Sequence, residues 1–144
     1  MTTAHPIAAF VEFCRRRQDI ADSLPGGVYL GHAPVTAGLP RAIIDPLDGS
    51  IDRSTGTRPD QTRIRSQTLQ VRVVAASAAD AAAAADALAC LDRAIIDEAA
   101  IHVCHDLEIG PYPDPPDAAR SGPDGSTLYV VVLQFTVSLN DLRI

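Results

Sequence analysis

The sequence predicts an α+β fold with a mostly antiparallel sheet of about four or five strands, packed against an N-terminal helix and a long alanine-rich helix. Three observations predict this class. Residues 62–75 alternate polar and apolar side chains as a strand does, residues 77–98 have the composition and period of a helix, and residues 127–139 alternate again. The expected order is α-β-β-β-α-β-β, within one domain spanning 1–144.

The first expected element is a helix from Pro6 to Asp22. Pro6 suits the first helical position, where its missing N–H costs nothing, and apolar residues recur along one face. Short strands are expected at 28–30 and 41–45. Residues 48–62 combine turn residues with both signs of charge, which predicts a projecting loop. It is either a plain loop tip or an arm that orders against a neighbouring subunit.

The long helix is expected to begin after the strand at 62–75. Ser77 and Asp80 have the spacing of an N-cap and an acidic first turn, and helical composition continues to Glu98. One face of this helix collects apolar side chains at intervals of three or four residues: Ala81, Ala84, Leu88, Leu91 and Ile95.

Residues 101–109 alternate with period two and predict a strand. One face would carry Ile101, Val103, Leu107 and Ile109, and the other His102, Cys104, Asp106 and Glu108. The alternation turns His105 away from His102 and Cys104, so neither a metal site nor a catalytic site is expected there. A second projecting loop, rich in proline and unable to pair as a strand, is expected at about 110–126.

The last strand, at 127–139, is apolar on both faces in its first half. Either a loop or another subunit must therefore cover Leu128, Val130 and Val132. Together with the charged hairpin, these side chains are the candidates for a subunit or partner interface: Ile51, Asp52, Arg53, Arg58, Asp60, Arg63, Arg65, Leu128, Val130 and Val132.

Composition and charge argue against several classes of function. The net charge of −6 and the absence of lysine argue against nucleic-acid binding as the main task. Three widely spaced cysteines favour free thiols over a disulfide framework. No signal peptide and no transmembrane segment is expected.

The order of elements and several residues resemble the tail terminator proteins, also called tail completion or head–tail joining proteins, of long-tailed bacteriophages and prophages. The resemblance lies in a short N-terminal helix, a strand that runs straight into an alanine-rich helix, and a closing strand. The matching residues are Gly27-Val28-Tyr29, Ala33-Pro34, Leu39-Pro40 before Ile43-Ile44, and Leu69 to Ser77.

The resemblance implies a structural protein with no catalytic, cofactor-binding or metal-binding residues. It would form a ring, expected to be a hexamer, at the head-proximal end of a phage tail tube, and so end tube polymerisation and join tail to head. The implied partners are further copies of the chain, the tail tube protein and a head–tail connector protein. DNA would pass through without specific binding, and the implied location is the tail or neck of a virion assembled in the bacterial cytoplasm.

Two alternatives stay open. The nearer one is another head–tail connector or neck protein. The farther one is a small enzyme or metal-binding protein that uses the strand face with His102 and Cys104.

Overall fold

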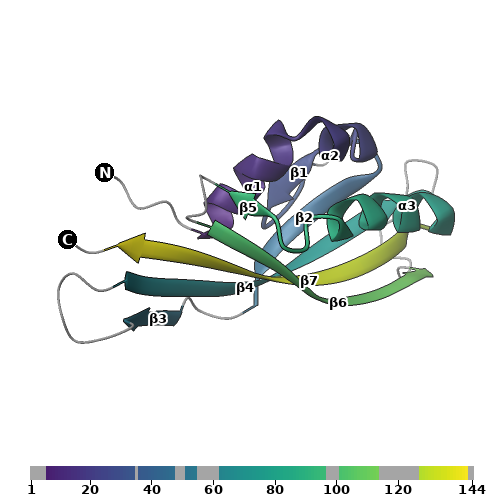
Figure 1. Cartoon of the computed structure of the whole chain (residues 1–144). Coiled ribbons are helices and arrows are strands. Elements are labelled where there is room, and N and C mark those ends of the chain that lie inside the picture. The colour runs from purple at the N-terminus through teal and green to yellow at the C-terminus, as the bar shows by residue number, and fades with distance from the viewer. Residues whose placement is uncertain are drawn as a thin grey trace.

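The computed structural model describes residues 6–34, 36–47, 51–54, 62–96, 101–113 and 127–142. Figure 1 shows one sheet with the helices on one of its faces. The helices and strands in these ranges are, in chain order, α1 (Pro6–Arg16), α2 (Gln18–Ser23), β1 (Val28–Leu30), β2 (Arg41–Pro46), β3 (Ile51–Ser54), β4 (Thr62–Ala75), α3 (Ala78–Ala89), β5 (Ile95–Ile96), β6 (Ile101–Pro113) and β7 (Tyr129–Leu142).

The strand order across the sheet is β1-β2-β4-β7-β6-β5, and β3 pairs with β4 on the same edge as β2. Among the described strands, only β1 and β2 run parallel to each other. The expected α+β class, the mostly antiparallel sheet and the order of the elements are confirmed. The five strands predicted from the sequence are β1, β2, β4, β6 and β7, and the short strands β3 and β5 are added to them.

The main core lies between the sheet and the helices. Alternate residues of β4 and β7, such as Val71 and Leu133, belong to one buried cluster with Phe10 of α1 and Leu88 of α3. α3 adds Ala84 and other alanines to this cluster, and their small side chains allow the helix to lie close to the strands. We call the face of the sheet that the helices cover the inner face, and the opposite one the outer face.

α3 begins as predicted but ends earlier. The Ser77 hydroxyl accepts a hydrogen bond from the backbone N–H of Asp80 at 3.1 Å, which confirms the N-cap. The prediction that the helix continues to Glu98 is wrong: it ends at Ala89, and the chain turns with Arg93 at a φ of 66°. Backbone hydrogen bonds between this turn and Val103 of β6 outweigh the helical propensity of the following residues.

The single helix predicted from Pro6 to Asp22 is two helices in the structure. Arg17 has extended backbone angles, φ −82° and ψ 119°, and separates α1 from α2. The break allows both Cys14 of α1 and Ile20 of α2 to be completely buried in the main core.

β6 is longer than predicted. It extends through Pro111 to Pro113 along β7, with register shifts after His105 and after Ile109. Proline is tolerated because β5 reaches only the first two residues of β6, so the described sheet has no further strand beside the rest of this edge. The remainder of the expected loop, 114–126, and residues 48–50 and 55–61 of the other expected loop lie outside the described residues.

Candidate assembly interface

β7 is buried on both of its faces in its first half, as predicted. Val131 belongs to the main core on the inner face, whereas Leu128 and Val130 form a second buried cluster with Val74. Leu128 and Val130 are only 2% and 4% exposed within a single chain, so the chain itself covers them. Of the predicted interface residues at 128, 130 and 132, only Val132 keeps a partly accessible side chain.

A β-bulge at Asp106 reverses the direction of the side chains that follow it in β6. His105 is paired with Phe135, but Leu107 is paired with Gln134, so one residue of β6 has no partner in β7. The predicted alternation is therefore correct up to the bulge and wrong beyond it. Leu107 and Ile109 lie on the outer face instead of the core face, and Glu108 lies on the face opposite to Cys104.

Four hydrogen bonds hold the bulge in place. The Thr136 hydroxyl donates to Asp106 Oδ2 at 2.6 Å, and the Cys104 thiol donates to Asp106 Oδ1 at 3.3 Å. The backbone N–H of His105 donates to Asp92 Oδ1 at 2.9 Å, and its imidazole Nε2 lies 3.1 Å from the Leu107 carbonyl oxygen. The bulge is thus a fixed feature of the fold.

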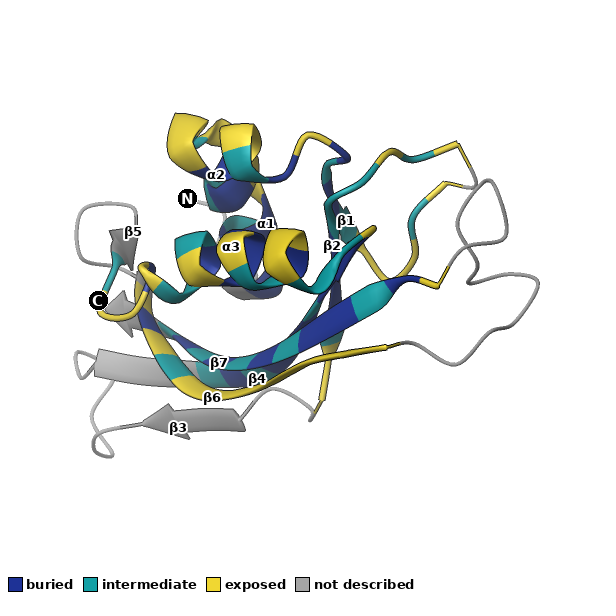
Figure 2. Cartoon of the chain, turned by 90° about the vertical axis from the view of Figure 1, so that its right-hand side faces the viewer, coloured by how far each residue is buried: buried dark blue, intermediate teal, exposed yellow. Residues whose placement is uncertain are grey.

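Three large apolar side chains are exposed on the outer face of β6. They are Leu107, Ile109 and Tyr112, with exposed fractions of 47%, 51% and 39%. Figure 2 shows this part of β6 as an exposed band along one side of the sheet. We call these three residues the β6 patch. A cluster of exposed apolar side chains is characteristic of protein–protein contact sites.

A second apolar surface lies at the opposite edge of the sheet. An open groove of about 480 Å³ is lined by Ile7 and Ala8 of α1, by Leu30 and Gly31 at the end of β1, and by Pro46 at the end of β2. Leu30 is 51% exposed. We call this surface the α1–β1 groove.

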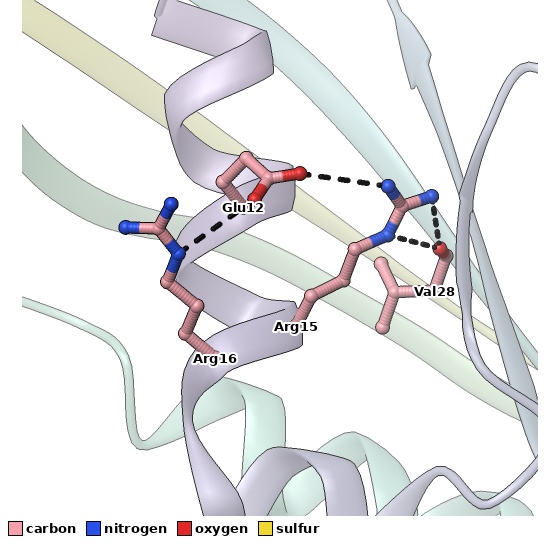
Figure 3. A network of polar contacts seen from close by, with 4 residues as sticks. All are labelled: Glu12, Arg15, Arg16 and Val28. Atoms are coloured by element: carbon pink, nitrogen blue, oxygen red, sulfur yellow. Dashed lines mark hydrogen bonds and ion pairs between the residues drawn. The ribbon is translucent and has the colours of Figure 1, made fainter.

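α1 closes the free edge of β1 next to this groove. The Arg15 guanidinium donates two hydrogen bonds, from Nε at 3.0 Å and from Nη2 at 2.9 Å, to the carbonyl oxygen of Val28. Glu12 forms ion pairs with both Arg15 and Arg16, so the two arginines share one carboxylate (Figure 3). The contacts leave this end of α1 with one more positive than negative charge.

Four of the charged residues predicted for the interface, Asp52, Arg53, Arg63 and Arg65, lie on the paired strands β3 and β4. Asp52 is paired with Arg65, and Arg53 with Ile64. Ile51 and Arg63 belong to the same two strands, while Arg58 and Asp60 lie outside the described residues. The structure does not bring this hairpin to the β6 patch, because β7 lies between β4 and β6.

On the strand face with His102 and Cys104, the thiol is engaged in a hydrogen bond to Asp106, and His105 lies on the other face. The hydrogen bond from the thiol to Asp106 raises the pKa of Cys104, so the weakly nucleophilic protonated form predominates. His105 points to the inner face, with its ring 5.0 Å from that of Phe135. In the part of the chain that the structure describes, no group of three or more His, Cys, Asp or Glu side chains could hold a metal ion.

Sequence reasoning missed the β6 patch. Leu107 and Ile109 fitted the core-facing positions of a regular strand, and Tyr112 stood in a segment expected to be a loop. The available signal was the apolar composition of 107–112 immediately before a proline-rich stretch.

Comparison with known proteins supports the fold assignment. No protein-family model and no curated protein matches the sequence. A chain in a solved structure described as the virion of native gene transfer agent (GTA) particle has the same fold, with a TM-score of 0.53 and 15% sequence identity. The alignment covers 96% of this chain and 100% of that chain. Among the described helices, none has the length and apolar character needed to cross a membrane.

Proposed function

We propose that this protein is a structural component of a phage-like virion and acts as a tail terminator. In this role it forms a ring, most simply a hexamer, at the head-proximal end of the tail tube, stops tube polymerisation and joins the tail to the head. The observation that carries the proposal is the full-length match of the fold to a chain of a gene transfer agent virion. The sequence resemblance to tail terminator proteins gives the more specific role.

The surfaces of the molecule support an assembly role. A ring of identical subunits needs two different surfaces on each subunit that fit each other, since the contact is heterologous. The β6 patch and the α1–β1 groove are two apolar surfaces at opposite edges of one sheet. The net charge of −6 also suits a ring through which DNA passes, because phosphates are repelled by an acidic surface.

Electron microscopy of the purified protein tests the proposal, first alone and then mixed with tail tubes assembled from a purified tail tube protein. We expect rings of about six-fold symmetry that sit at one end of each tube, and tubes that stop growing when the protein is added. Protein that stays monomeric under both conditions and leaves tube growth unchanged refutes the proposal.

A pull-down separates the terminator from the alternative of a connector or neck protein. The same tagged protein is presented to the tube protein and, separately, to the head portal protein. The proposal requires binding to the tube protein. Binding to the portal protein alone assigns the chain to the connector instead.

A further inference from the structure

We infer that the β6 patch of one subunit docks into the α1–β1 groove of a second copy of this chain. This inference rests on the proposed ring and names the surfaces that form its subunit contact. The groove and the patch are both apolar, and the groove of about 480 Å³ is large enough to take several apolar side chains. Burying Leu107, Ile109 and Tyr112 would remove the largest exposed apolar side chains of β6 from water.

The position of the two surfaces determines the type of contact. The groove includes the end of β1, which is one edge of the sheet, and the patch lies on β6 near the other edge. When one surface is used to bind a copy, the other remains free to bind the next copy. Such a contact is heterologous and generates a closed ring when the rotation between neighbours closes.

The backbone favours side-chain packing over strand addition. On β1, the carbonyl oxygen of Val28 already accepts hydrogen bonds from Arg15. On β6, Pro111 and Pro113 have no N–H to donate. Both devices prevent edge-to-edge pairing of strands. The contact therefore relies on the apolar side chains of the patch.

Charge around the two surfaces is complementary. The exposed carboxylate of Asp106 precedes the patch and is held to Thr136 on the same outer face, and residues 102–113 of β6 contain no arginine. Ile7 and Ala8 at the start of α1 line the groove, and the other end of the same helix carries Arg15 and Arg16 with Glu12 as their shared partner, so α1 has one more positive than negative charge. Opposite charge beside an apolar contact fixes orientation and disfavours wrong pairings, including a patch-to-patch dimer that would bring two Asp106 carboxylates together.

Site-specific cross-linking tests the contact. In the full chain, Cys90→Ser and Cys104→Ser remove the exposed thiols, and Cys14 stays because it is buried. Leu30→Cys is introduced in one tagged variant and Ile109→Cys in a second, untagged variant. After treatment with a short bis-maleimide, we expect linked species in the mixture of the two variants and little linkage in either variant alone. A chain carrying both cysteines should give a series of larger linked oligomers.

Linkage within Ile109→Cys alone, or no linkage in the mixture, overturns the inference. A second variant, Ile109→Asp, should weaken self-association by about tenfold or more, the loss of one well-packed interface side chain. Ala79→Asp, at an exposed position on α3, is the matched control and should leave self-association unchanged. Equal self-association of the two aspartate variants also contradicts the docking.

The result separates this inference from the proposed function. Rings in electron micrographs without linkage between positions 30 and 109 refute the docking and leave the terminator role intact. Linked rings that fail to bind tail tubes refute the terminator role and leave the docking intact.

Discussion

Replacing Gly26 by alanine should strongly destabilise the fold. Gly26 lies in the turn before β1, where its N–H donates to the Pro40 carbonyl oxygen at 2.8 Å and its own carbonyl oxygen accepts from the Tyr29 hydroxyl at 2.7 Å. A Cβ atom at this position would overlap the carbonyl group of Gly38 and lie 2.6 Å from the Pro40 oxygen. The difficulty is space, because Gly26 does not have a positive φ.

The expected loss follows from these contacts. Backbone atoms cannot rotate away, so the turn at Gly26 must move relative to residues 38–40. Losing two hydrogen bonds costs about 1 kcal/mol each, and overpacking of a close contact adds about 1–3 kcal/mol. A total of about 4 kcal/mol corresponds to a decrease in Tm of roughly 10–15 °C for a domain of this size.

Thermal and urea unfolding, followed by circular dichroism, measure the effect. The matched control is Gly38→Ala, on the other side of the same contact. There a Cβ atom meets only the Gly26 Cα atom at 3.6 Å, an ordinary van der Waals distance, so the stability should change by less than about 1 kcal/mol. A Gly26→Ala variant that unfolds within about 3 °C of the parent protein refutes the reasoning.

Three further predictions follow from other contacts. Arg15→Met removes both hydrogen bonds to the β1 carbonyl group and should lower the free energy of unfolding by about 1 kcal/mol, whereas Arg16→Met, at a side chain that is 82% exposed, should be nearly neutral in the same urea titration. Ser77→Ala removes the cap of α3 and should cost about 1 kcal/mol, measured in the same way. Burial raises the pKa of Cys14 to about 12, so at pH 8 iodoacetamide should modify the exposed Cys90 but not Cys14 in the folded protein. Mass spectrometry of the alkylated peptides measures both reactions, and equal modification of the two cysteines would contradict the prediction.

Local features of the fold could be predicted from the sequence because their causes are local. The cap at Ser77 depends on a residue three positions away, and the alternation of β4 is set by its own side chains. Features that depend on distant partners could not be predicted. α3 ends early because the chain after it pairs with β6, and β5 arises from the same pairing.

The candidate site shows the same limit more clearly. The bulge at Asp106 depends on Thr136 and on a contact between Asp92 and the backbone of His105, which are remote in sequence. Without that information, period-two alternation assigned Leu107 to the core. The double-sided burial of β7 could be predicted, because it follows from the composition of the strand alone. Which residues cover Leu128 could not be predicted from the sequence, because Val74 reaches it only through the pairing of the strands in the fold.

The position of β7 has a consequence for biosynthesis. β7 pairs along its whole length with β4 and also with β6, yet it follows both in the chain. Until residues 129–142 leave the ribosome, the apolar side chains of β4 have no neighbouring strand on that side, and such incomplete chains are prone to aggregate. A chain that has not yet exposed residues 129–142 therefore cannot complete this core, and a ribosome stalled before residue 129 would present a fragment with uncovered apolar side chains, which suits chaperone capture.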